Sequence, residues 1–398
     1  MMHFGNTRLL LAGAALLTLS GQAFALDGND VLAKINATYA AQGVKLVATS
    51  VKTEGKKVTL VGAKIEPPAE PEKGFPIGDI TLDGVDEADG GGYQINQISL
   101  SDVNLTEEGT TITAEDIYFS GVTVPGPATN GPLAAMVISD EGHIGPVKVS
   151  KDGKALFSLS EVTMSTTRDS DDTGLAFKAA FKDITADLST VEDPAAKDAI
   201  QKLALTNLAG EMTMKGSWEL TKGVIDVEDF TVDFDNIGAL TMTYNISGYT
   251  ADFIKSMQET IKAAAENPNK EQAQQASGLA MLGLIQQLNF NSAEINFTDD
   301  SITKRALDFA GKQQGMSGKQ LSQTIKALAP LMMAQLNMPD LQNQVSAAVN
   351  TYLDNPKSLT ITAKPPQPVP FPMIAGAAMA LSSVSVVMNS LRLRSVKL

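Results

Sequence analysis

Apolar and polar residues alternate in short runs from residue 44 to about residue 188. Turn-forming clusters separate these runs, among them Pro67-Pro68, Gly90-Gly91-Gly92, Pro125-Gly126-Pro127 and Asp171-Asp172-Thr173-Gly174. A period of two is typical of half-buried β-strands, and Gly, Pro and Asp clusters are typical of the turns between them. The pattern therefore predicts a succession of antiparallel strands.

Three six-residue units within this region share one pattern, with apolar residues at the first, third and sixth positions. They are Ile80–Val85, Ile98–Val103 and Ile117–Val122, and they start 18 and 19 residues apart. Leu156–Val162 is a looser fourth copy. The spacing fits a meander of stacked hairpins, and it fits three ordinary strands of one antiparallel sheet equally well. Both interpretations stay open.

Helical spacing frames the strand region on both sides. A first helix is expected from Asn29 or Asp30 to Gly43, and a second from Asp193 to about Asn207. Alternation then resumes in three runs around Met212–Leu220, Phe230–Phe234 and Leu240–Ile246. Further helices are expected at residues 252–265, 270–288, 302–312, 318–333 and 341–353, with one strand at 290–297 between them.

These elements predict an α+β fold, in which an extended antiparallel β-rich sheet or meander is followed by a mainly helical C-terminal portion. We expect three segments: residues 1–25 as a signal peptide, 26–190 as a helix plus β-meander domain, and 191–398 as a second strand group with a helical region. Whether the two strand groups share one sheet stays open.

The first 25 residues have the organisation of an export signal. Arg8 precedes an apolar run from Leu9 to Leu19, and the small-residue pattern Ala23-Phe24-Ala25 follows. This predicts a secretory signal peptide cleaved after Ala25, and hence a periplasmic protein. Because the chain has no cysteine, it lacks the residue that a lipoprotein acylates, and it forms no disulfide.

The C-terminal segment begins with a proline-rich stretch, residues 364–372, that is expected to be extended. Residues 373–387 are apolar and rich in small side chains, and Arg392, Arg394 and Lys397 follow. Because serines interrupt this run, we favour a short helix and a final strand over a membrane anchor. Contact of residues 373–391 with a membrane stays open.

Net charge is −14, which repels nucleic acid and anionic lipid headgroups. Nucleic acid is therefore not an expected partner. The acidity is explained most simply as a means of solubility in an aqueous compartment.

Candidate catalytic chemistry is sparse. Beyond the predicted signal peptide His143 is the only histidine, in a turn-like setting that predicts a surface position. Ser301-Ile302-Thr303-Lys304 matches Ser-x-x-Lys without a Lys-Thr-Gly element, and it is better explained as a helix start. We expect neither catalysis nor a cofactor.

Two acidic clusters, beginning at Asp169 and Asp233, imitate the start of a calcium loop. The twelfth position, which should be a bidentate glutamate, is Ala180 in the first and Tyr244 in the second. Turn chemistry explains both clusters, and no metal site is expected.

The apolar-x-apolar-x-x-Val units resemble the repetitive β regions of AsmA-type envelope proteins of Gram-negative bacteria. The resemblance covers Ile80–Val162 and Glu211–Gly248 and rests on pattern, without a diagnostic motif. It implies a long sheet with an apolar inner face that contacts lipid. The cleavable signal differs from the N-terminal membrane anchor common in that group.

Three functional hypotheses follow. The first is a non-catalytic periplasmic protein that binds a lipid or other amphiphile in an apolar groove lined by Met212, Met214, Trp218 and Met242. The alternative is an envelope scaffold that binds a protein partner. A third is a hydrolase with two carboxylates, which requires a close, half-buried Asp/Glu pair in a cleft.

Overall fold

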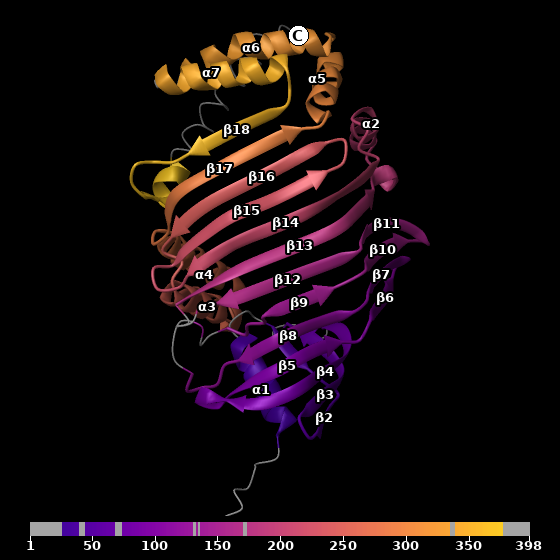
Figure 1. The fold of residues 1–398 in the computed structure, drawn as a ribbon, viewed down its shortest axis with the longest axis vertical. Helices are drawn as coiled ribbons and strands as arrows, with labels where there is room; N and C mark the ends of the chain where they lie inside the picture. The colour runs from indigo at the N-terminus through magenta and orange to yellow at the C-terminus, as the bar shows by residue number, and fades with distance from the viewer. Residues whose placement is uncertain are drawn as a thin grey trace, which may run out of the picture.

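A computed structural model describes residues 26–39, 44–67, 74–129, 136–169, 173–334 and 339–376, together with Leu133. The predicted signal peptide, the segment 377–391 and part of the Asp169 cluster lie outside these residues. The described strands form a single 19-stranded sheet, accompanied by helices that are concentrated in the C-terminal half (Figure 1). The predicted α+β class is confirmed.

The N-terminal half begins with helix α1 (Gly28–Tyr39), whose apolar residues Val31 and Ile35 are buried. The strands that follow are β1 (Lys45–Val47), β2 (Ser50–Glu54), β3 (Lys57–Glu66), β4 (Phe75–Ala88), β5 (Gly92–Leu100), β6 (Val103–Glu107), β7 (Thr110–Ala114), β8 (Ile117–Val124), β9 (Glu141–Ile144), β10 (Val147–Lys151), β11 (Lys154–Leu159), β12 (Glu161–Arg168) and β13 (Gly174–Asp187).

The C-terminal half adds six of the described strands and most of the described helices. Its strands are β14 (Asn207–Glu219), β15 (Val224–Phe234), β16 (Gly238–Ser247), β17 (Asn289–Asp299), β18 (Ser358–Ala363) and β19 (Val369–Pro370). Its helices are α2 (Pro194–Lys202), α3 (Ala251–Glu266), α4 (Lys270–Ile285), α5 (Ile302–Gln313), α6 (Gly318–Ala334) and α7 (Pro339–Asp354).

The main path through the sheet joins β3, β4, β5, β8, β9 and β12–β18 as antiparallel neighbours. The three repeat units lie on β4, on β5 with its continuation, and on β8. Leu82 pairs with Ile98, and Ile98 with Phe119, so the third position of one unit meets the first position of its neighbour across the antiparallel ladder. The repeat therefore marks neighbouring strands of one sheet.

The sheet runs without interruption across residue 190, where the sequence suggested a boundary. Strands β13 and β14 lie on either side of this position and pair over twelve residue pairs. Helix α2, which Asp193 caps by accepting a hydrogen bond from the Ala196 N–H at 2.7 Å, connects them outside the ladder. The two strand groups are one sheet.

Four strand junctions fall side by side and form what we call the crease. They are residues 101–102, 115–116, 145–146 and 160, and the ladder of β13 is irregular beside them between Phe181 and Ile184. Beyond the crease, β6, β7, β10 and β11 pair as an extension of the sheet. Because bulges and breaks bend strands and increase their twist, the crease accounts for a change of strand direction here.

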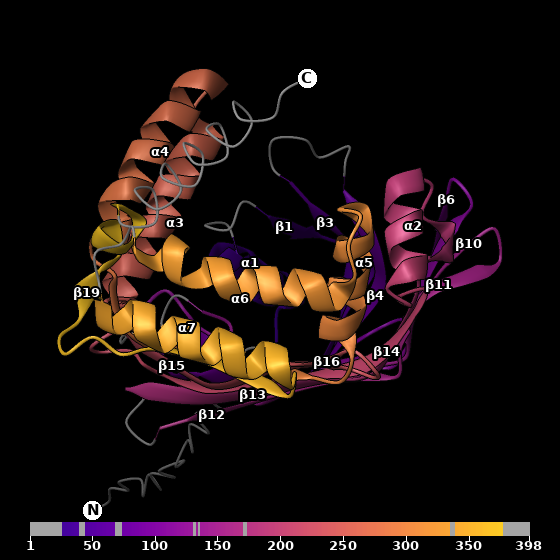
Figure 2. The same ribbon diagram turned by 90° about the horizontal axis from the view of Figure 1, so that it is seen from above.

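The helices lie on one side of the curved sheet (Figure 2). At the N-terminal end, Val31 and Ile35 of α1 pack with Val58, Leu60 and Leu82 in the larger hydrophobic core. A second core joins Trp218 and Leu220 to α3 and α4 through Phe253, Ile254 and Leu284. Both cores use the same face of the sheet, as the strand registers below establish.

Candidate functional site

One line of residues crosses the sheet from β3 to β18 at a single register level, and we call it the Met242 row. Each member is the direct cross-strand partner of the next, so all of them project from the same face. Its members are Val58, Leu82, Ile98, Phe119, Gly142, Met164, Ala179, Met214, Phe230, Met242, Ile295 and Ile361.

A second line, the Met212 row, runs parallel to the first from β9 to β18. It lies two residues away along each of these strands, which places it on the same face. Its members are Ile144, Val162, Phe181, Met212, Val232, Leu240, Phe297 and Leu359. Every member of both rows is apolar or glycine. Together the rows form one uncharged face of the sheet, here called the apolar face.

Coverage of the apolar face changes along the sheet. At β3 and β4 the rows are buried under α1, where Val58 and Leu82 are at most 1% exposed. At β16–β18 the same rows reach the surface: Leu240 is 36% exposed, Ile295 40% and Ile361 59%. The described part of the chain therefore leaves the C-terminal half of the apolar face partly open.

The four residues predicted to line a groove are on this face, in two different settings. Met212, Met214 and Met242 are half-buried members of the rows. Trp218 lies further along β14 and is packed in the second core, where its ring contacts Tyr249 and its Nε1–H donates to the Tyr249 carbonyl at 2.9 Å. Thus the three methionines lie among open residues, whereas Trp218 anchors α3 and α4 to the sheet.

The opposite face of the same strands is polar. Between the two rows, each residue is the cross-strand partner of the next, and all but Ala180 are polar: His143, Thr163, Ala180, Thr213, Thr231, Thr241, Asn296 and Thr360. Thr231 and Thr241 hydroxyls lie 2.9 Å apart, and Asn296 donates to Thr360 at 2.7 Å. Polar side chains of this face bond to one another across the ladder, whereas the two rows form the apolar side of the sheet.

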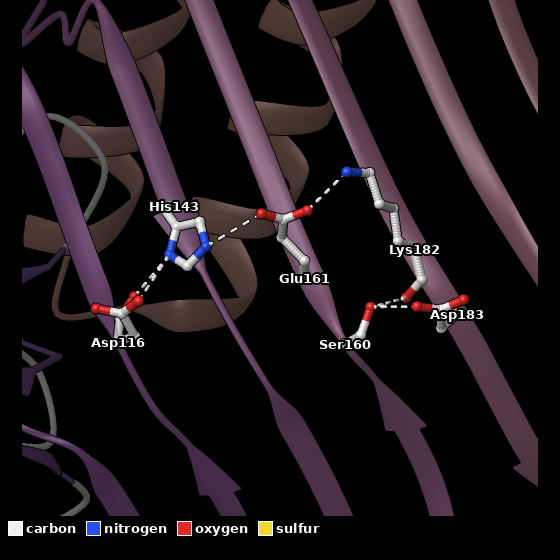
Figure 3. Close-up of polar contacts among 6 residues, drawn as sticks. All are labelled: Asp116, His143, Ser160, Glu161, Lys182 and Asp183. Atoms are coloured by element: carbon white, nitrogen blue, oxygen red, sulfur yellow. Dashed lines mark hydrogen bonds and ion pairs between the residues drawn. The ribbon is translucent and has the colours of Figure 1, made fainter.

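A chain of polar contacts follows the crease on this outer face (Figure 3). His143 Nδ1 lies 2.8 Å from the Asp116 carbonyl oxygen, which only accepts, so Nδ1 is the donor. Its Nε2 lies 3.4 Å from Glu161 Oε1, and Lys182 donates to Glu161 at 2.7 Å. The ring also stacks on Tyr118. The expected turn at His143 is wrong, because the residue lies in strand β9; its side chain, 17% exposed, faces the outer surface of the sheet.

Two non-glycine residues at the crease have left-handed backbone conformations, Asp116 with φ 52° and Asp183 with φ 49°. Aspartate tolerates this region better than most residues because its short carboxylate bonds locally. The Ser160 hydroxyl donates to the Asp183 carboxylate at 2.7 Å, and the Ser160 N–H donates to the Lys182 carbonyl at 3.0 Å. These hydrogen bonds hold the neighbouring strand junctions of the crease together. The polar side chains of the crease therefore have a structural role.

A shallow hollow of about 600 Å³ adjoins this network on the outer face. Charges of both signs border it, including Lys178, Lys215, Glu161 and Asp229. The hydrogen bond from Lys182 is the main cause that lowers the pKa of Glu161, and a lowered pKa is opposite to what a general acid needs. The hollow gives the carboxylate-pair hypothesis no support.

Within the described ranges, no group of three or more His, Asp or Glu side chains is arranged to hold a metal ion. The Ser301–Lys304 segment begins α5, and Asp299 accepts a hydrogen bond from the Thr303 N–H at 2.8 Å. The Ser301 hydroxyl donates to the Asn236 carbonyl at 2.7 Å instead of facing Lys304. Its contacts are those of a helix start.

Sequence reasoning identified the methionines but not the rows, which depend on strand register. A register is a property of pairs of strands far apart in the chain, such as β17 and β18, whose Ile295 and Ile361 are 66 positions apart. The nearest sequence signal was the shared apolar spacing of the repeat units, which reflects the common register of β4, β5 and β8.

Comparison with known proteins adds little. A family model described only as "Uncharacterized protein" matches residues 231–394, which is less than half of the chain. No curated protein matches the sequence.

Proposed function

We propose that this protein is a non-catalytic protein of the bacterial periplasm that binds the acyl chain of a lipid or another amphiphile on its apolar face. The observation that carries the proposal is the pair of apolar rows, which continue from a buried core at β3 and β4 to exposed positions at β16–β18. A contiguous apolar surface on a folded protein is typically an interaction site.

Neutrality of the rows favours hydrocarbon over a charged ligand. No member of either row carries a charge or a hydrogen-bonding side chain, so the surface offers nothing to bind a headgroup. Each methylene that leaves water on binding contributes about 0.8 kcal/mol. The headgroup of a bound amphiphile is therefore expected to stay at the edge of the face, in water.

Two sequence features support the location and the ligand class. The pattern in residues 1–25 is that of a cleavable export signal. The repeat resembles that of AsmA-type envelope proteins, which implies contact between an apolar sheet face and lipid. We propose the same kind of contact here, without transferring any functional residue.

A first experiment purifies the exported protein without detergent and compares its native and denaturing mass spectra. We expect a discrete released mass that matches a lipid, and a mature N-terminus at Leu26. A ligand-free protein that stays unchanged after incubation with envelope lipids would contradict the proposal. Co-purification of a stoichiometric protein without lipid would favour the scaffold alternative.

A matched pair of variants on β16 locates the binding face. Met242→Gln introduces an amide into the Met242 row, whereas Thr241→Gln places the same amide on the outer face of the same strand. Burying an unpaired amide against hydrocarbon costs about 1–3 kcal/mol, so the affinity of Met242→Gln for a fatty acid should fall about tenfold or more. Thr241→Gln should bind like wild type, and equal effects of the two variants would assign the ligand elsewhere.

A further inference from the structure

The outer side of α4 is an apolar helix surface that nothing in the described chain covers. Leu279 is 71% exposed, Leu282 59% and Ile285 39%. Ala273 and Leu284, by contrast, are buried, and Met281 packs against the second core. At about 100° per residue, Leu279 and Leu282 point away from the side of the helix that Met281 and Leu284 turn toward the sheet.

Two segments without charge meet at the base of α4. Residues 272–293 contain no Asp, Glu, Lys, Arg or His, and neither do residues 365–391. The first segment includes most of α4, and the second includes β19 and the short helical turn at 371–376. They are joined where the Phe371 N–H donates to the Leu288 carbonyl at 3.1 Å and where Val369 pairs with Phe290.

Two apolar side chains of the second segment are exposed as well. Met373 is 66% exposed and Ile374 37%. We call Leu279, Leu282, Ile285, Met373 and Ile374 the neutral surface. The rim of a protein–protein interface is typically polar, whereas hydrocarbon disfavours every charge near it, by about 2.5–3.5 kcal/mol per residue at the centre of a bilayer.

We propose that the neutral surface docks on a lipid bilayer and brings the apolar face of the sheet to the membrane from which its ligand comes. This inference rests on the proposed function. Helix α4 has 16 residues, about 24 Å, which is shorter than the hydrocarbon core of a bilayer. Across the described ranges, no helix is both long and apolar enough to cross a membrane. Because a helix of about 24 Å is too short to span the hydrocarbon core, the proposal places α4 along the membrane interface.

Helix α4 lies on the same side of the sheet as the proposed ligand-binding face. The inner side of α4 belongs to the core that contains Trp218, on the same face as the two rows. Figure 2 shows α3 and α4 rising together from one side of the sheet, on its helix-covered side. A bilayer in contact with the outer side of α4 therefore lies on the same side of the sheet as the apolar face.

Net charge sets the expected lipid preference. The whole chain carries a formal charge of −14, so anionic vesicles repel it, and an uncharged docking surface gains nothing from anionic headgroups. Binding should therefore be stronger to phosphatidylcholine vesicles than to vesicles that contain phosphatidylglycerol, and high salt should not release the protein from phosphatidylcholine.

Vesicle flotation with the purified protein tests the proposal. We expect wild type to float with phosphatidylcholine vesicles and the double variant Leu279→Gln/Leu282→Gln to lose tenfold or more in partitioning. Leu328→Gln/Leu331→Gln is the matched control, since Leu328 and Leu331 are also exposed leucines of one helix, α6. No flotation of wild type, or equal losses in both variants, would overturn the proposal.

Because the chain has no cysteine, a single introduced cysteine can carry a fluorescent dye at a chosen position. This gives a second measurement of docking that is independent of flotation. A polarity-sensitive dye on Leu279→Cys should shift to the blue with phosphatidylcholine vesicles, and the same dye on Leu328→Cys should not. A dye on Leu279→Cys that responds to a stoichiometric envelope protein but not to vesicles would assign the surface to a protein partner. Fatty-acid binding without vesicles, measured in parallel, distinguishes failure of docking from failure of the proposed function.

Discussion

Asp30 is the residue that ties α1 to the sheet. Its carboxylate forms an ion pair with Lys34 one turn later and accepts a hydrogen bond from the Tyr93 hydroxyl at 2.5 Å. Lys34 also lies 4.5 Å from the centre of the Tyr93 ring. Since Tyr93 is on β5 and only 4% exposed, these contacts hold the helix over the buried end of the rows.

Asp30→Asn should therefore destabilise the protein by about 1 kcal/mol at pH 7, the net value of one intramolecular hydrogen bond. Urea unfolding at fixed pH measures the difference. The hydrogen bonds from Lys34, first, and from Tyr93 lower the pKa of Asp30 below its ordinary value of 3.8. A lowered pKa stabilises the folded state above the unfolded pKa, and this contribution disappears as the pH falls through the folded pKa.

The difference between wild type and Asp30→Asn should accordingly be constant from neutral pH down to about pH 5 and shrink below about pH 4. Tyr93, the hydrogen-bond partner of Asp30, has the opposite pH dependence. Burial is the main cause that raises the pKa of Tyr93, so its contribution is present below pH 10 and is lost as the pH rises further. A stability difference that grows on acidification would show that Asp30 is not held by these bonds.

Single residues were predicted well where the alternation of one strand decides their environment. Met212, Met214 and Met242 alternate with threonines, and the structure places the two residue types on opposite faces. His143 was misplaced because the glycine before it suggested a turn. In the structure Gly142 belongs to the Met242 row, where an added Cβ would meet Phe119 and Met164 at 3.0 Å. Only the three-dimensional neighbourhood reveals how little room a larger residue has there.

Two turns that the sequence predicts separately, at Gly90–Gly92 and at Pro125–Pro127, pack against each other. Gly126 lies so close to the Gly90–Gly92 turn that an added Cβ would be 2.2–2.4 Å from backbone atoms of all three glycines. Backbone cannot rotate away as a side chain can. The sequence marks both turns, but nothing local indicates that they touch.

Gly126→Ala should therefore destabilise the protein more than Gly55→Ala does. Gly55 has a left-handed φ of 61° with no atom within 4 Å of the added Cβ, so its replacement costs only conformational strain, about 1 kcal/mol. Overpacking against fixed backbone adds about 1–3 kcal/mol at Gly126. Thermal unfolding of both variants measures the order, and an equal cost would mean that the two turns can separate freely.

Among the helices, the predicted ranges agree with α3 to α7 to within a few residues, because caps and proline breaks are local signals. Strand β18 was missed. Its six residues, Ser358–Ala363, follow a proline break and pair with β17 across three intervening helices. A short strand with such a distant partner has too few residues for periodicity to identify it.

The continuity of the sheet is the principal feature of the whole molecule, and it bears on how the chain folds. Cutting between residues 190 and 191 would expose the edges of β13 and β14, which share twelve residue pairs and carry Phe177, Phe181, Met212 and Met214. Exposed apolar edges of this length aggregate. Fragments 26–190 and 191–398 should be insoluble when produced alone and should form a soluble pair when produced together, as size-exclusion chromatography would show. Two soluble, folded fragments would instead establish independent domains.

Ligand recognition should also be a property of the whole face and not of a single pocket. From β12 to β18 the rows cross six interstrand spacings of about 4.8 Å, or about 29 Å in all, without a charge. Affinity in the series decanoic, myristic and stearic acid should therefore rise with chain length, by at most about fourfold per methylene, the factor that corresponds to about 0.8 kcal/mol. Methyl esters should follow the free acids closely, since no charged residue of the rows contacts a carboxylate. Calorimetry with both series decides the matter: an affinity that depends on the carboxylate and not on chain length would place the ligand on the polar outer face, beside Lys178 and Lys215.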